Sequence, residues 1–276
     1  MPQRRLVDNG DLGSSHTMSI TTSFSQKFHG PWRWVSVCTV MALTACGGGG
    51  SQPDSTLDTL IGVWKDHDSS RKTLAAVVLP DKNYWVFYGS NTINPTGFDQ
   101  GVASANDNIF AASVYEFSNQ SSRTSASVNA RFSSNRITGE LSYPSAPVTN
   151  SFDLTRMSVT EFNTGNTART SDIKEGRWTG KLSGLEAWLQ KNALGDGFSG
   201  QDSKGCQYDV TFTPMSNFNA FTVTMDFLDA TCADGISRTT GLALIYQPSG
   251  ETPKQMLLAV QNFDRSKGWL FSATQP

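Results

Sequence analysis

The sequence predicts an all-β protein made of two small antiparallel barrels, or barrel-like sheets, arranged in tandem. Three observations carry this prediction. Short segments with strand character, separated by polar turns, follow one another from residue 57 onward. Within many of them apolar and polar side chains alternate, which is the period of a half-buried strand. A Gly-x-Trp triplet also opens each half of the chain, at Gly62-Val63-Trp64 and at Gly176-Arg177-Trp178.

The clearest hairpin lies in the first half. In SASVNARF (125–132) every second residue is apolar, and the alternation resumes in the segment 136–143. The polar turn SSN (133–135) joins these two segments. Period-two alternation on both sides of a short polar turn predicts an antiparallel hairpin.

The other strands are predicted by the same reasoning. Two segments, TLAAVVL (73–79) and YWVFY (84–88), are apolar on both faces, so we expect both of their faces to be covered. Together with the hairpin strands, the predicted strands are, in chain order, 61–66, 73–79, 83–89, 98–104, 109–117, 150–156, 177–182, 206–213, 220–228, 239–247, 255–261 and 268–274.

One short helix is predicted near residues 183–194. Ser183 is a suitable N-cap, and Leu185, Trp188 and Leu189 have the i, i+3, i+4 spacing of an apolar helical face. A glycine-rich loop, GDGFSGQDSKG, follows and begins with the pattern G-x-G-x-x-G. Here a helix precedes the loop and a strand follows it, whereas a dinucleotide requires the order strand, loop, helix. We therefore expect no cofactor.

The repeated triplet suggests a division into two halves. Residues 57–158 form the predicted N-terminal β half and residues 175–276 the C-terminal half, with a polar, turn-rich linker at 159–174. A single larger barrel or a β-sandwich that uses both halves is the alternative architecture. A transmembrane barrel ranks below both, because many predicted strands are shorter than the roughly nine to eleven residues that a crossing requires.

Residues 1–45 have the features of an export signal, with Met18 as an alternative translation start. Basic residues precede an apolar run at 34–43, which is about half the roughly twenty residues that a transmembrane helix needs. Leu43-Thr44-Ala45-Cys46 resembles the lipobox of bacterial lipoproteins, and the following GGGG is similar to that of uncharacterised proteobacterial lipoproteins. The resemblance implies that the signal is removed and that Cys46 carries the lipid.

The same resemblance predicts a location. Residues 46–56 begin with glycines and read as a flexible, lipidated tether. Gly47 rather than Asp follows Cys46, which in bacterial lipoproteins implies passage to the outer membrane. The sequence does not determine on which face of that membrane, periplasmic or external, the protein lies. The lipid is the membrane attachment that we expect.

Apart from the lipidated Cys46, two cysteines remain after the predicted cleavage, Cys206 and Cys232. In an oxidising periplasm or at the cell surface, such a pair most often forms a disulfide. Cys206 begins one predicted strand and Cys232 lies just beyond the next, so a hairpin would bring the sulfurs together. Closing this loop should stabilise the fold by roughly 3 to 4 kcal/mol.

The Gly-x-Trp triplet resembles the first strand of lipocalins and related calycin barrels. In that family the tryptophan plugs the closed end of the barrel, and an arginine from a late strand lies across it. The resemblance assigns Trp64 and Trp178 as plugs or ligand-facing residues, with Arg156 or Arg265 as the arginine.

Composition and motifs exclude several functions. Without its leader the chain has more acidic than basic residues and no basic cluster, so we expect no nucleic-acid partner. One histidine, His67, remains in the polar stretch KDHD and reads as an exposed turn residue rather than a base or metal ligand. No catalytic residue and no metal site are predicted. Glycoside hydrolysis uses a pair of carboxylates that come together only in the folded protein, so the sequence alone does not exclude it.

The leading functional hypothesis is therefore a non-enzymatic envelope lipoprotein that binds a small apolar ligand or a partner protein through a β-barrel. The alternative is a structural or envelope-interaction lipoprotein whose barrel is filled with side chains. A hydrolase based on carboxylates ranks last. The sequence does not determine the ligand, the partner or the oligomeric state.

Overall fold

The computed structural model divides the chain into two units, residues 1–50 and residues 51–276. It describes residues 55–276 except 69–71, 90–94, 107, 119–122, 159–161, 163–166, 174–175, 194–196, 247–252 and 276. The predicted signal peptide and the lipidation site Cys46 lie outside the described residues.

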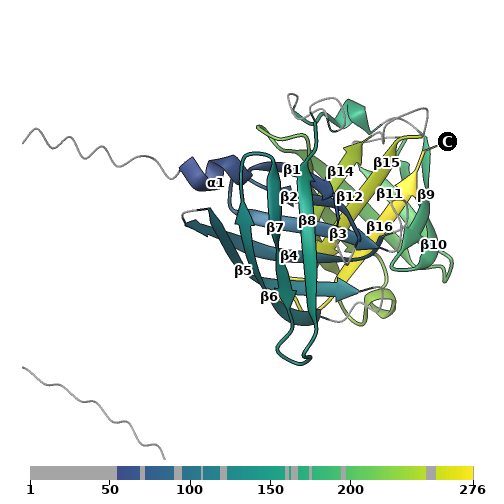
Figure 1. Cartoon of the computed structure of the whole chain (residues 1–276). Coiled ribbons are helices and arrows are strands. Elements are labelled where there is room, and N and C mark those ends of the chain that lie inside the picture. The colour runs from purple at the N-terminus through teal and green to yellow at the C-terminus, as the bar shows by residue number, and fades with distance from the viewer. Residues whose placement is uncertain are drawn as a thin grey trace, which may run out of the picture. The chain divides into compact units, whose positions relative to one another are not determined.

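In the described part of the chain, the strands form two closed antiparallel barrels (Figure 1). The first barrel contains β1 (Gly62–Asp66), β2 (Lys72–Val78), β3 (Asn83–Gly89), β4 (Pro95–Asn106), β5 (Ile109–Ser118), β6 (Arg123–Phe132), β7 (Arg136–Ser142) and β8 (Thr149–Arg156). The second contains β9 (Arg177–Leu182), β10 (Leu185–Lys191), β11 (Phe198–Asp202), β12 (Gln207–Pro214), β13 (Phe221–Phe227), β14 (Arg238–Tyr246), β15 (Gln255–Gln261) and β16 (Gly268–Thr274). Short helices are α1 (Ser55–Leu60), η1 (Thr170–Asp172) and η2 (Ala230–Ala233).

Each barrel follows the simplest possible order, with every strand paired to the next one along the chain. Pairing of β1 with β8 closes the first barrel, and pairing of β9 with β16 closes the second. Closure leaves no exposed strand edge. The predicted tandem of all-β barrels is confirmed, and the single larger barrel and the sandwich are excluded.

Alternation along the strands decides which side chains enter a barrel. In β6 the buried residues are Ala126, Val128, Ala130 and Phe132, which point inward, while their polar neighbours are exposed. Strands β2 and β15 are instead buried on both faces. For TLAAVVL in β2, this agrees with the prediction that both faces are covered.

The helix predicted at 183–194 is wrong. Ser183 and Gly184 both have positive φ, 47° and 87°, and form a tight hairpin turn in which Leu182 pairs with Leu185. Two successive residues with positive φ are the turn geometry that fits the twist of paired strands. Residues Leu185–Lys191 form β10, with Ala187 and Leu189 inside the barrel. The i, i+3, i+4 spacing of Leu185, Trp188 and Leu189 therefore does not mark a helical face, because these residues belong to a strand.

Two further elements were not anticipated. The predicted glycine-rich loop contains β11, in which Gly200 lies directly beneath the ring of Tyr208. A side chain at Gly200 would occupy the space of that ring, so the glycine serves packing rather than loop flexibility. Helix α1 begins within the segment expected to be a tether.

Three buried clusters hold the described residues together. One fills the first barrel, a second fills the second barrel, and a third lies between the two barrels. The third cluster joins outward-facing residues of β2–β5 to those of β14–β16. Its largest members from the two sides are Trp85, Phe87, Phe98, Phe117, Tyr246, Leu257 and Leu270.

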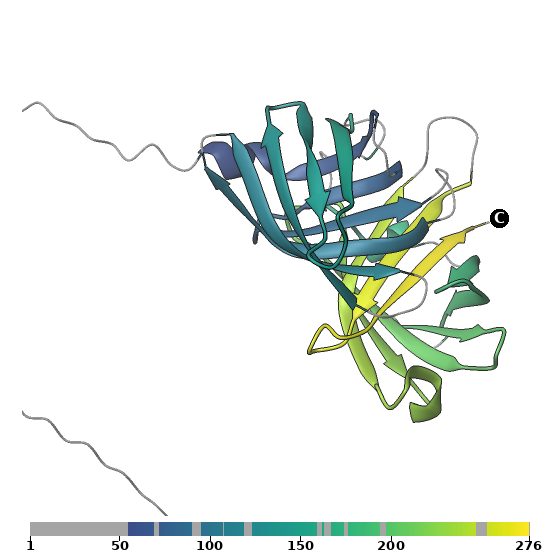
Figure 2. The same ribbon diagram turned by 60° about the horizontal axis from the view of Figure 1, so that its bottom comes forward.

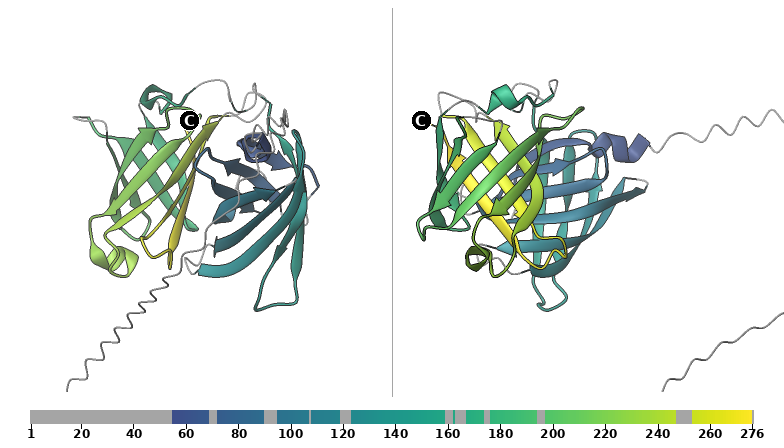
Figure 3. Two further views of the ribbon diagram at one scale, coloured as in Figure 1. Left: turned by 90° about the vertical axis from the view of Figure 1, so that its left-hand side faces the viewer. Right: turned by 180° about the vertical axis from the view of Figure 1, so that it is seen from behind.

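The interface between the barrels also contains polar and close backbone contacts. Gln261 of β15 donates its Nε2 hydrogen to Gln100 Oε1 of β4 at 3.3 Å, and both side chains are buried. A Cβ at Gly268 of β16 would lie 2.6 Å from Phe98 of the first barrel. In Figures 2 and 3 the yellow strand β16 accordingly lies on the side of the second barrel that faces the first.

None of the helices within the described ranges has the length and the apolar character needed to cross a membrane.

Candidate functional site

The floor of the first barrel is a tryptophan held by hydrogen bonds and by an arginine. Trp64 of β1 is fully buried, and its indole Nε1 donates to the carbonyl oxygen of Leu60 in α1 at 3.0 Å. The Arg156 guanidinium of β8 lies 4.4 Å from the indole ring. Arg156 also donates to the carbonyl oxygens of Ile61 and Ser134, each at 2.8 Å, and to that of Thr59.

These contacts close one end of the barrel. The guanidinium satisfies backbone carbonyls that the strands leave unpaired there, and burial lowers the pKa of Arg156. An arginine remains charged under any such shift at neutral pH. Gly62, with φ 152°, completes the floor, because a Cβ at this position would collide with the Arg156 guanidinium.

The second barrel repeats this arrangement with one change. Gly176 also has positive φ, 132°, and a Cβ there would lie 2.9 Å from Gln275 Nε2. Gln275 thus occupies the position that Arg156 has in the first barrel. Trp178 is fully buried, and its Nε1 has no hydrogen-bond partner within the described part of the chain.

The structure separates the remaining predicted arginine from Trp178. Arg265 lies in the turn between β15 and β16, with φ 55°. Its guanidinium lies 5.9 Å from the ring of Tyr115, and its carbonyl oxygen accepts a hydrogen bond from Arg123 Nη1 at 3.4 Å. Both contacts are with the outside of the first barrel.

Two tyrosines of β3 form one wall of the first barrel's interior. Tyr84 and Tyr88 each pair across to a glycine of β4, Gly101 and Gly97 respectively. A Cβ at Gly101 would lie 2.6 Å from the Tyr84 hydroxyl and 2.5 Å from a backbone oxygen. The glycines therefore let both rings lie flat against β4, which fixes where the two hydroxyls are.

A carboxylate lies between these two glycines on the same inward face of β4. Asp99 is 4% exposed and pairs with Glu116 of the neighbouring strand β5. Glu116 Oε1 accepts a hydrogen bond of 2.6 Å from the Tyr88 hydroxyl. The interior thus carries two acidic side chains at directly opposed positions of adjacent strands.

The Tyr84 hydroxyl differs from that of Tyr88. Tyr84 is 3% exposed, and no described residue forms a hydrogen bond with its hydroxyl. Burial, and secondarily the charge of Asp99, raise the pKa of Tyr84 well above its usual value. The phenol is therefore neutral at physiological pH and can both donate and accept a hydrogen bond.

A cavity of about 60 Å³ lies between this wall and the tryptophan floor. Its polar lining includes Tyr84, Asp99, Thr73 and Asn150, and most of the remainder is apolar. The apolar lining residues are Trp64, Ala76, Val77, Val78, Val86, Phe110, Val128, Ile137, Leu141, Phe152 and Leu154. A buried water needs roughly 10–15 Å³ on this measure, so the cavity has room for about four to six water-sized groups.

The interior of the second barrel is packed with aromatic side chains. Phe212 contacts Phe198 and Phe221 edge-on, at ring distances of 5.1 and 5.9 Å. Phe227 packs on Trp269 at 5.1 Å. The two barrels thus share a topology but differ in what fills them.

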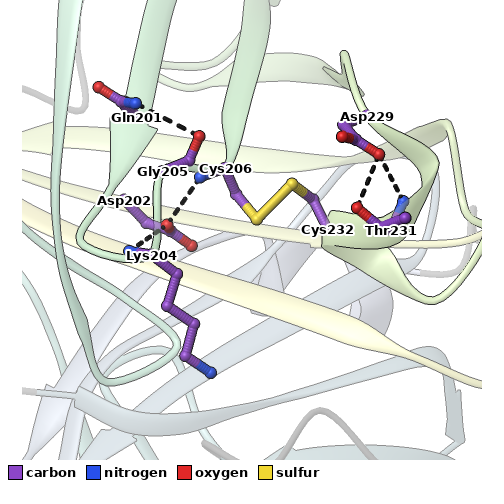
Figure 4. Close-up of a disulfide and its surroundings, with 8 residues drawn as sticks. All are labelled: Gln201, Asp202, Lys204, Gly205, Cys206, Asp229, Thr231 and Cys232. Carbon is purple, nitrogen blue, oxygen red and sulfur yellow. Dashed lines mark hydrogen bonds between the residues drawn. A yellow bond between two sulfur atoms is a disulfide. The ribbon is translucent and has the colours of Figure 1, made fainter.

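The predicted disulfide is confirmed. Cys206, just before β12, is bonded to Cys232 in η2, with their Cα atoms 5.4 Å apart (Figure 4). Asp202 Oδ1 accepts hydrogen bonds from the backbone N–H groups of Lys204 and Cys206, at 2.8 and 3.0 Å. Asp229 Oδ1 similarly accepts from the backbone N–H and the hydroxyl of Thr231. These turns fix the backbone on both sides of the bridge.

His67 lies outside the barrel interior. Its side chain is 53% exposed, with Nδ1 3.8 Å from Asp153, a carboxylate that Arg136 already binds through two nitrogens. Among the described residues, no group of three or more His, Cys, Asp or Glu side chains could hold a metal ion.

Sequence reasoning missed Tyr84, Asp99 and Glu116. A signal for Tyr84 and Asp99 was present: Tyr-x-Val-x-Tyr in β3 faces Gly-x-Asp-x-Gly in β4, and alternation sends all six named residues to the same, inward side. The two motifs could be recognised as one site only once the pairing of β3 with β4 was known.

The chain was compared with known proteins. No protein-family model and no curated protein matches it. One similar solved structure is that of a candidate outer membrane protein from Bacteroides fragilis, with 9% identity, a TM-score of 0.27, and coverage of 80% of this chain and 99% of that one. Another is a mutant of the vaccine antigen transferrin-binding protein B from Haemophilus parasuis, with 10% identity, a TM-score of 0.27, and coverage of 75% and 66%. At these scores neither similarity bears on the function of this chain.

Proposed function

We propose that this protein is a non-enzymatic envelope lipoprotein that binds a small ligand inside its first barrel. The observation that carries the proposal is the cavity above Trp64, whose wall is mostly apolar but includes the buried Tyr84 hydroxyl. An apolar enclosure with a few convergent polar groups is typical of ligand sites.

The size of the cavity restricts the ligand. Sites for drug-sized molecules measure about 300–1,000 Å³, whereas this cavity measures about 60 Å³. A ligand of about four to six non-hydrogen atoms fits this space. The small apolar ligand predicted from the sequence is thereby narrowed to a very small molecule with one polar group.

Anchoring is the second part of the proposal. The lipobox at residues 43–46 and the glycines after it support lipidation of Cys46, with residues 46–56 as the tether. Gly47 supports an outer-membrane location. In cells, Cys46→Ser should abolish metabolic incorporation of palmitate, and continued labelling would contradict the anchor.

The filled second barrel favours a different role for that half of the chain. Aromatic and aliphatic side chains pack together in its interior, so we assign the interaction to its outer surface. Phe263, in the turn between β15 and β16, is fully exposed at 102%. We propose contact with an envelope protein as the second candidate function.

Ligand binding can be tested by NMR of methyl-labelled protein titrated with 1-butanol, a neutral molecule of suitable size. Methyl signals of Val128, Ile137 and Leu141 should shift in a saturable way, because these side chains line the cavity. Signals of Val223 in the second barrel should not shift. Val128→Phe, which fills the cavity, should remove the response, with the unchanged Val223 signals reporting that the chain is folded. Absence of saturable shifts in the unaltered protein, both with this alcohol and with a charged molecule of the same length, would contradict the proposal.

A further inference from the structure

The Tyr84 hydroxyl is a polar group of the cavity that the described part of the fold leaves unsatisfied. It is buried, it lines the cavity, and no described residue forms a hydrogen bond with it. A buried polar group without a partner is costly, and native proteins rarely retain one without a bound water, ion or ligand. Tyr208 shows the usual solution, because its hydroxyl in the second barrel donates to the Trp188 carbonyl oxygen at 3.0 Å.

The charge around Tyr84 indicates which ligand would fit. Asp99 lines the same cavity and lies two residues from Gly101, the glycine beneath the Tyr84 ring. Asp99 is also directly opposite Glu116 on the next strand. Like charges at opposed positions of an antiparallel pair repel each other, and a positive charge beside them would offset that repulsion.

We propose that the first barrel binds a small primary amine, with Tyr84 and Asp99 as the residues that recognise its ammonium group. This inference rests on the proposed function and adds the ligand class to it. An ammonium carries three hydrogen-bond donors, so it can donate to the Tyr84 hydroxyl and to the Asp99 carboxylate together. The hydrocarbon part of the ligand would lie on Trp64, Val128 and Leu141, which line the remainder of the cavity.

The cavity volume sets the length of the molecule. Room for about four to six water-sized groups corresponds to a butyl chain with its nitrogen. A longer amine or a diamine would require the barrel to open. A molecule with an anionic group would add a further negative charge beside Asp99 and Glu116 and is excluded on electrostatic grounds.

A bound water is the alternative partner for the Tyr84 hydroxyl. Ordered waters commonly occupy buried polar cavities of this size. If water alone serves Tyr84, a neutral alcohol and an amine of equal length should bind equally, or neither should bind. Comparison of the two compounds therefore distinguishes a built amine site from a hydrated cavity.

The test is titration of the purified protein at pH 7 with n-butylamine and with 1-butanol, followed by the methyl signals of Ile137 and Leu141. We expect n-butylamine to bind at least about tenfold more tightly, since loss of one partner of a buried charge pair has an effect of this size or larger. Asp99→Asn, which keeps the shape of the side chain, should remove the preference for the amine. Tyr84→Phe should weaken amine binding by about threefold or more.

Two control variants are available in the second barrel. Asp209→Asn removes one negative charge outside the cavity, where Asp209 accepts a hydrogen bond from Ser199. Tyr208→Phe removes the hydroxyl of a tyrosine whose ring lies over a glycine, as the ring of Tyr84 does. Both should leave the affinity for n-butylamine unchanged.

The outcomes separate the two proposals. Binding of 1-butanol as tightly as n-butylamine, or an amine preference that survives Asp99→Asn, overturns the amine site and leaves ligand binding in place. Failure of both compounds to bind overturns ligand binding and the amine site together. A preference for the amine that depends on both Tyr84 and Asp99 supports both.

Discussion

Trp64 and Arg156 lie directly opposite each other on β1 and β8, with the guanidinium 4.4 Å from the indole ring. This pair joins the first and last strands of the first barrel and closes the end of the barrel at which Trp64 forms the floor. Arg156 reaches three carbonyl oxygens besides the ring, and Trp64 reaches a fourth in α1. The pair therefore ties the strand closure, the floor of the cavity and helix α1 into one unit.

Replacement of Arg156 by lysine should destabilise the protein by about 2–3 kcal/mol. A single ammonium cannot serve three carbonyl groups in the geometry of the planar guanidinium, and buried acceptors without donors are costly. Urea unfolding measures the change. Arg177→Lys is the matched control. The Arg177 guanidinium lies 4.2 Å from the centre of the Trp188 ring, but the residue is exposed. This substitution therefore changes a cation–π contact without leaving buried carbonyl groups unsatisfied. Equal effects of the two substitutions would contradict the role given to the carbonyl contacts.

Tyr84→Phe and Tyr208→Phe should change stability in different directions. In ligand-free protein, Tyr84→Phe removes a buried hydroxyl without a partner, so stability should stay the same or rise by up to about 1 kcal/mol. Tyr208→Phe removes the donor of a hydrogen bond to the Trp188 carbonyl oxygen and should cost about 1 kcal/mol. Thermal unfolding monitored by circular dichroism compares them. A clear loss of stability in Tyr84→Phe would show that its hydroxyl has a partner within the fold.

Gly101→Ala should destabilise the protein by about 2–3 kcal/mol. The new methyl group would lie 2.6 Å from the Tyr84 hydroxyl and 2.5 Å from the Ser113 carbonyl oxygen, and the backbone oxygen cannot move aside without distorting β5. Gly197→Ala is the control, since a Cβ there finds its nearest neighbour at 3.4 Å, the end of the Asn192 side chain. Comparable urea midpoints for the two variants would contradict the close packing of Tyr84 on β4.

Replacement of Cys206 and Cys232 together by serine should cost about 3–4 kcal/mol in the loop-entropy account, because the bridge closes a loop of 26 residues. Unfolding in urea with and without reductant checks this value. Reductant should shift the midpoint of the unaltered protein toward that of the double variant. The double variant itself should not respond, and a response would mean that the reductant acts elsewhere.

Stability should fall in acid partly through Asp153. The hydrogen bond from Arg136, with a smaller contribution from nearby positive charge, lowers the pKa of Asp153 below its usual value. Its contribution is complete above the unfolded pKa of about 3.9 and is lost as the pH falls through the lower folded value. Asp153→Asn should therefore reduce the slope of stability against pH below about pH 4. Parallel curves for both proteins would contradict this account.

Much of the fold follows from local patterns in the sequence. Alternation of apolar and polar residues located most of the strands. The segment TLAAVVL is apolar on both faces, which predicted that its outward face is covered as well, and the neighbouring barrel covers it. The disulfide followed from the number and placement of the cysteines. These features depend on side chains that are close together in the sequence, so they need no knowledge of the tertiary structure.

Three features required the structure. The segment Leu185–Lys191 satisfies helical and strand spacing alike, and only the positive φ values at Ser183 and Gly184 decide for a strand. The opposition of Asp99 and Glu116 depends on the register of β4 against β5. The cavity depends on the small difference between the volume of the first barrel and that of its side chains, which no local pattern reveals.

The most direct test of the central claim is a high-resolution crystal structure of the protein purified from the cells that naturally produce it. The account predicts density for a small non-protein molecule in the first barrel, within hydrogen-bond distance of the Tyr84 hydroxyl and Asp99, and none within the packed second barrel. A first barrel that holds only ordered water, or that is closed by its own side chains, would contradict it.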